Sequence, residues 1–265
     1  MLRWICSEMK SCPRFNNDKD HDMKSALSDD LFDLAVACRV IALYGHEDKT
    51  LGHLSWRDPG GRGVWIKSAH KGLAEIKSSE DFVLIDMDGK RLVGDAPLHK
   101  EWPIHTEIIR SRPEINVVGH THPFYACLLA ATNEDLMGIA HEGCYFNAHV
   151  PRYRGTSFLI DTHQLGVDLK NALGDHLIVL MNNHGLTFCG SNLAEACTLA
   201  IVFEKACKQQ ITLKATGYGM IQPDREEIAL KARNLSRLGI LSGFWDYYKR
   251  QLGAYEKANS GLIVI

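Results

Sequence analysis

The spacing of apolar residues changes several times along the chain, and each change indicates a new element. From Ser28 to about Tyr44, apolar residues recur at helical spacing, with Ser28 placed as a cap and Gly45 as a stop. The apolar runs in HLSWRD and VWIKS, on either side of the turn DPGGRG, predict two short strands. FVLIDMDGK predicts a third strand that enters a tight Asp-Gly turn.

The middle of the chain alternates helix and strand. HKEWPIHTEIIRSRP predicts a helix, because Pro103 is tolerated in a first turn and Pro113 prevents continuation. A helix through this stretch would place Glu101 and His105, four residues apart, on one face. The runs NVVGHTH, SFLI and HLIVLM predict further strands.

The last third of the chain is predicted to be helical. Asn192 with Glu195 resembles a capping box that opens a long helix to about Lys214, closed near Gly217. A final helix is expected over roughly Asp224–Tyr255. Because helical segments flank the strands on both sides, the sequence predicts one α/β domain with three layers.

Length and composition fit a single soluble domain. The 265 residues are 45% hydrophobic and 23% charged, with a formal net charge of −2. We expect residues 26–265 to form the domain with a C-terminal helical tail, and the polar residues 1–25 to be a loose extension. The charge pattern offers no basic stripe for nucleic acid, and no apolar run is long enough for a membrane. Eight cysteines without a C-x-x-C pair, and no secretory segment, predict reduced thiols and a cytoplasmic location.

Three histidines carry the candidate chemistry. His120 and His122 would project to the same side of an extended strand, and His184 follows the apolar run 176–181. Three imidazoles at strand ends suit an open, catalytic metal site, with Glu101 as a fourth ligand or a base. With 13 histidines in the chain, the alternative is that these are ordinary surface or core histidines.

These residues resemble the class II aldolase and adducin family. The resemblance lies in GHLSWR, in Glu101 ahead of a helix ending in RSRPEINVVGHTHP, in NNHG with His184, and in AEACTLAIVFEKAC. It extends from about Ser28 to Lys214. It implies a three-layer α/β/α sandwich around a mostly antiparallel sheet, usually in a homotetramer with active sites at subunit interfaces.

The resemblance also implies a chemistry. His120, His122 and His184 would hold one divalent ion, with zinc preferred and manganese, magnesium or iron as alternatives. Such an ion acts as a Lewis acid and stabilises an enolate when a carbon–carbon bond breaks. Glu101 would move a proton to or from that carbon, or act as a further ligand. The alternative for Glu101 is a solvated acid at a helix N-terminus.

The chain departs from the family's sugar-phosphate aldolases where they hold phosphate. Those enzymes have an Asn in the segment matching GHLS, a Thr-Gly or Ser-Gly turn, and a Ser-Ser pair before the catalytic Glu. Here the first position is His53, the turn region reads KSAHKGL, and the pair is His99–Lys100. We therefore expect a small anionic substrate that is not held by a phosphate cradle. The expected substrate contacts are His53, Ser55, His70, Lys71, His99, Lys100 and Tyr248, although Lys71 and Lys100 could be ordinary surface residues.

A second departure points to decarboxylation. IAHEGCYF lies where the aldolases carry a proton-donating Tyr, and it offers His141, Glu142 and Tyr145 as catalytic candidates. Such an acid pair resembles branches that decarboxylate hydroxylated aromatic or 3-keto acids. In FWDYYKRQL, Tyr248 and its aromatic neighbours could line a ring pocket, or this helix could simply pack on the core.

The sequence thus predicts a divalent-metal-dependent carbon–carbon lyase that decarboxylates a hydroxyaromatic or 3-keto acid. Three alternatives stay open. The first is an aldolase that cleaves a sugar, phosphorylated or not, or a hydroxy-ketone. The second is a non-haem iron oxygenase, and the third is a non-catalytic, adducin-like module.

Overall fold

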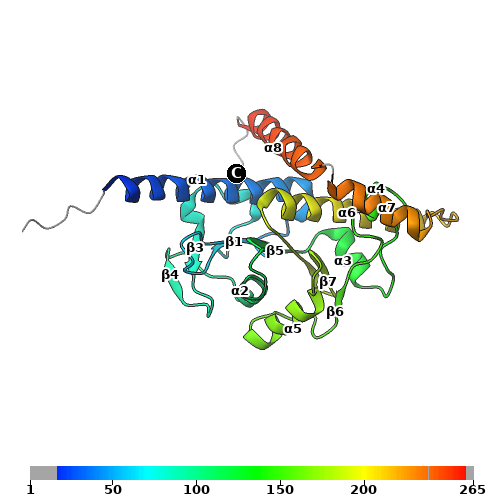
Figure 1. Ribbon diagram of the computed structural model, residues 1–265, viewed down its shortest axis with the longest axis horizontal. Coiled ribbons are helices and arrows are strands. Elements are labelled where there is room, and N and C mark those ends of the chain that lie inside the picture. Colours follow the sequence, from blue (N-terminus) through cyan, green and yellow to red (C-terminus); the bar gives the residue numbers. More distant parts are fainter. Residues whose placement is uncertain (1–16, 238, 261–265) are drawn as a thin grey trace, which may run out of the picture.

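The computed structural model describes residues 17–237 and 239–260, and its centre is one eight-stranded sheet (Figure 1). The strand order is β4-β3-β2-β1-β5-β8-β7-β6, and every neighbouring pair is antiparallel except β6 with β7. The strands are β1 His53–Arg57, β2 Val64–Lys67, β3 Phe82–Ile85, β4 Arg91–Val93, β5 Val117–Thr121, β6 Arg152–Tyr153, β7 Ile178–Met181 and β8 Gly185–Gly190.

Helices cover both faces of this sheet, so the three-layer prediction is confirmed (Figure 1). One layer contains α1 and α6, and the other contains α2 and α5. The helices are α1 Asn17–Ile41, α2 Trp102–Ser111, α3 Phe124–Ala130, α4 His141–Cys144, α5 His163–Leu173, α6 Leu193–Ala215, α7 Arg225–Arg237 and α8 Ile240–Asn259. A π-helical turn, Ala42–His46, extends α1, and two short 3₁₀ turns lie at Leu73–Glu75 and Ser79–Asp81.

The apolar strands are buried on both faces, which explains their continuous hydrophobic runs. In β2, Trp65 packs in the core beneath α1 and α6, whereas Val64 and Ile66 pack in the core beneath α2 and α5. Val117 and Val118 of β5 divide between the two cores in the same way. Successive strand side chains point to opposite faces, so a strand between two helical layers needs apolar residues at nearly every position.

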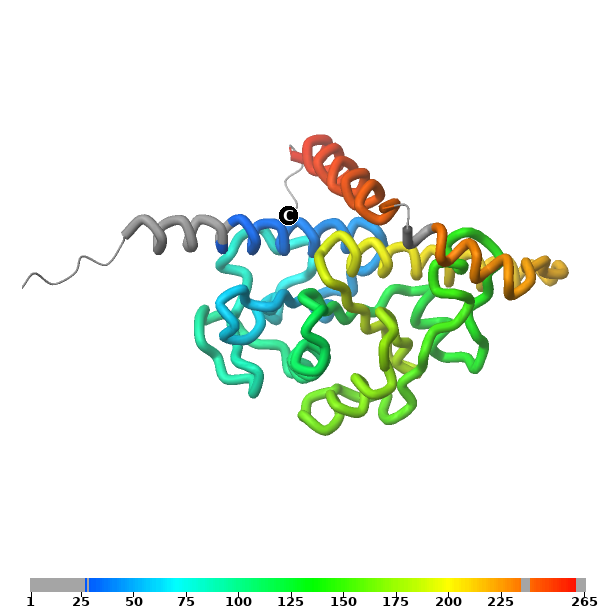
Figure 2. The backbone as a smooth tube through the Cα atoms, in the orientation of Figure 1, coloured from blue at the N-terminus to red at the C-terminus, as the bar shows by residue number. Residues whose placement is uncertain are grey.

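The C-terminal helix returns over the first helix. Figure 2 shows α8 crossing above α1, and Arg39 of α1 pairs with Glu256 of α8 at 2.8 Å. Trp245 and Leu252 of α8 are buried in the same core as α1 and α6. The helical tail is therefore packed on the domain.

The N-terminal boundary of α1 differs from the prediction. The helix begins at Asn17, so the expected start at Ser28 is wrong. Residues 17–28 contain no Gly or Pro that would stop a helix on its way upstream. Residues 17–25, expected to be loose, are part of this helix, and residues 1–16 lie outside the described residues. The expected stop at Gly45 agrees with its left-handed φ of 95°.

Two further predictions of secondary structure are wrong. SFLI, residues 157–160, is a loop, and the strand of this region is β6 instead. The amide of Ile160 donates to Glu101 at 3.0 Å rather than to a neighbouring strand. The single helix expected over Asp224–Tyr255 is two helices, because Gly239 adopts a left-handed φ of 61° between α7 and α8.

Two expectations concern cysteines and membranes. The six cysteines in the described part of the chain are all free, while Cys6 and Cys12 lie outside it. Within the ranges that the structure describes, no helix combines the length and apolar character required to cross a bilayer.

Candidate active site

Three histidine side chains converge at one edge of the central strands. His120 lies in β5, His122 follows the end of this strand, and His184 lies in the turn between β7 and β8. Nε2 of His120 and Nε2 of His122 are 3.1 Å apart, so the two side chains do project to the same side. One ring nitrogen from each of the three histidines lies within 4.8 Å of the other two.

Strand pairing produces this convergence. β5 pairs with β8, with Thr121 opposite Leu186, so the turn that precedes β8 lies against the end of β5. Gly185 allows this turn to approach the end of β5 closely. A Cβ at this position would lie 2.6 Å from Cδ2 of His122 and 2.7 Å from the carbonyl oxygen of Thr121. Only the absence of a side chain allows the two segments to meet here.

In two of the three histidines, His120 and His122, the other ring nitrogen is held by a hydrogen bond that suits metal binding. Nδ1 of His120 lies 3.1 Å from the carbonyl oxygen of Leu186, and Nδ1 of His122 lies 3.1 Å from Oδ2 of Asp48. Both partners are acceptors, so Nδ1 carries the proton in each ring and Nε2 keeps its lone pair. Burial lowers the pKa of both histidines, and it lowers that of His184 to about 4. Three neutral imidazoles with convergent lone pairs fit a divalent ion with an open position.

Glu101 faces this centre from the start of α2. It is the residue before the helix, and α2 begins with Trp102 and Pro103. Its Oε2 lies 3.7 Å from Nε2 of His120, and its Oε1 lies 3.7 Å from Nε2 of His184. The amide of Ile160 donates to Oε1 at 3.0 Å. Burial nevertheless raises the pKa of Glu101, which suits a carboxyl group that exchanges a proton.

A second set of histidines lies behind Glu101. The register of β1 and β5 places His53 directly opposite His120, and Nε2 of His53 is 3.8 Å from Oε2 of Glu101. Nδ1 of His53 is 2.7 Å from Nε2 of His105, and the ring of His99 lies against that of His53, with centroids 4.4 Å apart. Glu101 and His105 therefore both reach His53, although Glu101 precedes the helix.

These histidines are neutral rather than cationic. Burial is the largest cause that lowers the pKa of His53, and it lowers the pKa of His99 to about 3. Although the expected substrate is anionic, neither residue supplies positive charge to it. They offer hydrogen bonds and ring faces instead.

The other expected substrate contacts divide into buried and exposed residues. Ser55 is fully buried behind His105, at 2.7 Å from its Nδ1, so it is linked to the site only through other side chains. His70 is exposed at a left-handed φ of 68°, and Lys100 is exposed at the start of α2. Lys71 forms an ion pair with Asp81.

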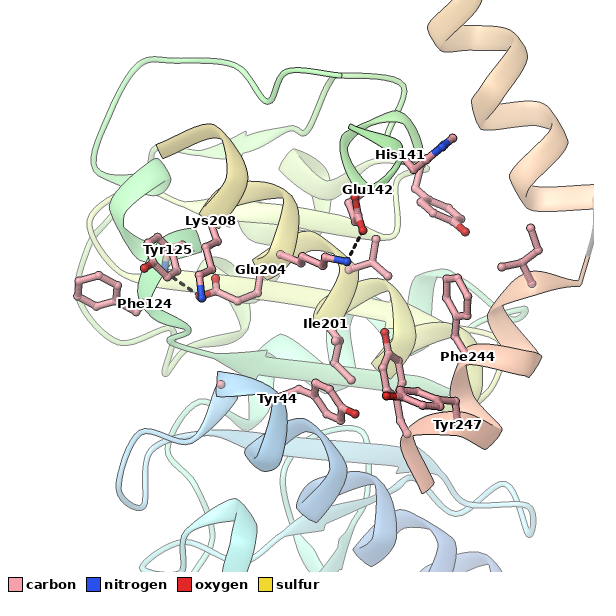
Figure 3. A pocket seen from close by; sticks show the side chains of 16 residues that line it. Tyr44, Phe124, Tyr125, His141, Glu142, Ile201, Glu204, Lys208, Phe244 and Tyr247 are labelled. Carbon is pink, nitrogen blue, oxygen red and sulfur yellow. Dashed lines mark hydrogen bonds and ion pairs between the residues drawn. The ribbon is translucent and has the colours of Figure 1, made fainter. Parts of the chain in front are cut away.

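The remaining candidates lie in a different pocket. His141, Glu142, Tyr145 and Tyr248 line a pocket of about 870 Å³ between α4, α6 and α8 (Figure 3). Glu142 contacts Lys205 at 2.6 Å and Gln209 at 3.1 Å, both on α6. Tyr248 packs on Tyr44, with ring centroids 4.5 Å apart. Within one chain, the structure does not bring these residues to the three histidines.

Sequence reasoning missed Asp48 as part of the site. It lies in the segment between α1 and β1 and contacts His122 across 74 positions of the chain. An acidic residue in GHEDKTLGH carries no local pattern that reveals a distant partner. The link from His105 to His53 was missed for the same reason.

The family model for the class II aldolase and adducin N-terminal domain matches residues 32–211. The chain belongs to the class II aldolase and adducin family. The match begins in α1 and ends in α6, so it includes the whole sheet and the three histidines. The resemblance inferred from the sequence motifs is thereby confirmed.

Individual members of this family are similar over most of the chain. The 3,4-dihydroxyphthalate decarboxylase of Arthrobacter keyseri is 31% identical over 201 residues, which are 69% of this chain and 78% of the relative. An aldolase II superfamily protein from Pseudomonas syringae has a TM-score of 0.77 and 25% identity, covering 87% of this chain and 93% of that one. The L-fuculose 1-phosphate aldolase from Glaciozyma antarctica PI12 has a TM-score of 0.76 at 20% identity, covering 94% and 96%. Relatives of this kind make the chain an enzyme of the carbon–carbon lyase class.

Proposed function

We propose that this class II aldolase family member decarboxylates a hydroxyaromatic or 3-keto acid, with one divalent metal ion, preferably zinc, per subunit. The observation that carries the proposal is the pairing of a complete three-histidine centre with neutral histidines where sugar-phosphate aldolases keep a phosphate cradle. The similarity to a dihydroxyphthalate decarboxylase supports the same reaction class.

His120, His122 and His184 would hold the ion, and in His120 and His122 the hydrogen bonds to Nδ1 leave the lone pair of Nε2 free. When bound, a divalent ion supplies Lewis acidity that stabilises negative charge developing on the substrate oxygen. The backbone carbonyl of Leu186 and the carboxylate of Asp48 keep two of the rings in the required tautomer.

Glu101 is the group placed to handle the proton. As the bond between the carboxylate and the adjacent carbon breaks, carbon dioxide leaves and the electron pair stays on that carbon. The protonated carboxyl group of Glu101 can then donate its proton to the carbon and regain one from solvent. The raised pKa of this buried carboxyl group favours the protonated form that the step requires.

His99 and His53 would shape the cavity for the substrate ring. Their rings lie against each other at a tilt of 44°, His53 beside Glu101, and burial lowers the pKa of both so that they stay uncharged. Neutral rings accommodate an aromatic acid better than a doubly charged phosphate, which requires donors or cations.

We also propose a homo-oligomer, with a tetramer as the expected form, in which the pocket of His141, Glu142 and Tyr145 meets the histidine centre of another subunit. The exposure of large apolar side chains supports this assembly, since Phe124 and Tyr247 line the same pocket and are 65% and 47% exposed. Light scattering after size-exclusion chromatography tests the oligomer. A monomer at micromolar concentration would contradict it.

The activity is tested by carbon dioxide release from a panel of hydroxyaryl and 3-keto acids, with Zn²⁺, Mn²⁺, Mg²⁺ or Fe²⁺ supplied. We expect turnover that a strong chelator removes and that the added metal restores, while the His122→Ala variant stays at background. Ketone or aldehyde products in place of carbon dioxide would show an aldolase, and iron-dependent oxygen uptake would show an oxygenase. Release no faster than that of His122→Ala on every acid would overturn the proposal.

A further inference from the structure

A buried chain of hydrogen bonds leads from β1 toward the three-histidine centre. Ser55 Oγ donates to the carbonyl oxygen of Val118 at 3.4 Å, and it accepts the Nδ1 proton of His105 at 2.7 Å. A neutral imidazole carries a single N–H, so Nε2 of His105 is an acceptor. It takes the Nδ1 proton of His53 at 2.7 Å. This series of hydrogen bonds therefore leaves Nε2 of His53 without a proton and with its lone pair free.

This lone pair faces the site without a donor. His53 is fully buried, and its Nε2 has no hydrogen-bond partner within the described part of the chain. Oε2 of Glu101 lies 3.8 Å away, which is beyond hydrogen-bonding distance whether or not the carboxyl group is protonated. A buried acceptor that lacks a donor is costly, so its retention in a site points to a donor on the ligand.

His53 is not one of the three-histidine group but belongs to a second group of candidate ligands that shares His120 with it. The ring nitrogens of His120, His122 and His184 form one group, whereas His53 groups with Glu101 and His120. Because strand register places His53 opposite His120, an atom that reaches His53 lies next to one that reaches the three histidines. A small molecule that reached both places would do so through atoms at neighbouring positions.

We propose that Nε2 of His53 accepts a hydrogen bond from a second hydroxyl of the substrate, adjacent to the oxygen that binds at the three-histidine centre. The site would thus select a vicinal dihydroxy compound, a catechol-type acid, and this inference rests on the proposed function. An ionised phosphate or carboxylate brings no proton to this acceptor and is disfavoured. A ligand that lacks this hydroxyl leaves the buried acceptor unpaired and is rejected much more strongly than a ligand with one extra methylene group, so His53 determines specificity.

The first test measures binding rather than turnover. Catechol and phenol are titrated calorimetrically into the zinc-loaded protein and into its zinc-loaded variants. Part of any preference for catechol comes from the metal, so the readout is how the ratio of the two affinities changes. We expect His53→Phe, which has no acceptor, to lower the ratio by about tenfold or more. We expect His53→Gln, whose amide oxygen can accept, to lower it by less than about threefold. An unchanged ratio in His53→Phe would overturn the inference.

The second test reads the tautomer directly in the wild-type protein. Nitrogen-15 NMR of histidine-labelled protein, with the His53 signal assigned through His53→Gln, should show a protonated Nδ1 and an unprotonated Nε2. A proton on Nε2 would overturn the inference even if a variant failed to fold. The outcomes also separate the two proposals. If no carbon dioxide is released but the preference for catechol depends on His53, only the decarboxylase reaction is refuted. If carbon dioxide is released but the preference for catechol does not depend on His53, only the role of this residue is refuted.

Discussion

Oδ2 of Asp48 lies 3.1 Å from Nδ1 of His122, although 74 positions of sequence separate the two residues. The carboxylate fixes the tautomer of the imidazole and makes its other nitrogen a better ligand. Burial would raise the pKa of Asp48, but its contacts with Lys49 and His122 together lower it, so it stays ionised. Asp48 would thus support metal binding without being a ligand.

We expect Asp48→Asn to weaken zinc affinity by about 10–100-fold while the fold is kept. Competition with a chelator of known affinity measures this loss. Asp88→Asn is the matched control, because Asp88 is exposed and its carboxylate pairs with Arg110 at the surface. Equal affinity in Asp48→Asn and the control would show that the ion pair does not tune the centre.

Glu101 is expected to act on the substrate and not as an essential ligand. Glu101→Gln should lower kcat by about 10²–10⁴-fold and retain nearly one metal ion per subunit, because the three histidines remain. Turnover is measured alongside metal content by elemental analysis. Glu107→Gln is the control, since Glu107 is a buried acid of α2 that bonds to His163 instead. Loss of the metal from Glu101→Gln would make this carboxylate a ligand.

Gly185 sets the distance between the β8 turn and the end of β5. In Gly185→Ala, the new methyl group would meet His122 and the backbone of Thr121 below 3 Å, so one strand must move. We expect about 1–3 kcal/mol of destabilisation and a lower metal affinity. Urea unfolding and chelator competition measure the two effects. Gly219→Ala, whose Cβ would meet nothing within 4 Å, should change neither, and a metal affinity equal to that of the wild type in Gly185→Ala would contradict the geometry.

Buried neutral histidines should make the metal-free protein sensitive to acid. His46 bonds to Thr121 at 2.9 Å, and burial lowers its pKa to about 4, against about 6.5 in an unfolded chain. Between these values the unfolded state binds more protons, so the free energy of unfolding rises with pH. The contribution of neutral His46 to the free energy of unfolding should be fully present above about pH 6.5 and should fall as the pH is lowered toward 4.

Urea denaturation of the metal-free protein between pH 5 and pH 7.5 measures this dependence. The slope should be smaller in His46→Gln, which cannot take up a proton in the unfolded state. The variant of an exposed histidine, His176→Gln, should keep the wild-type slope. Equal slopes in His46→Gln and the wild type would show that His46 contributes nothing to acid sensitivity.

Local pattern predicted the layers of the fold and the short-range part of the site. The two-residue spacing of His120 and His122 predicts a shared direction in any strand, and the structure places both Nε2 atoms 3.1 Å apart. Asn192 caps its helix as predicted, with its side chain accepting from the amide of Glu195, but the Glu195 carboxylate accepts from the amide of Ser191 and so does not complete a capping box. The strand prediction failed at Ile160, whose amide donates to the side chain of Glu101 instead of to a neighbouring strand. The helix prediction failed at Gly239, which adopts a left-handed φ inside an otherwise helical pattern.

The sequence by itself determined which segments are buried, which histidines share a strand face, and which family the motifs resemble, because these depend on spacing along the chain. Only the tertiary structure decided that Asp48 holds His122, that His105 orients His53, and that His141 and Glu142 lie in another pocket of the same chain. Strand register and helix packing create these contacts, and both are set by the burial of all elements together. No local pattern of residues encodes such distances.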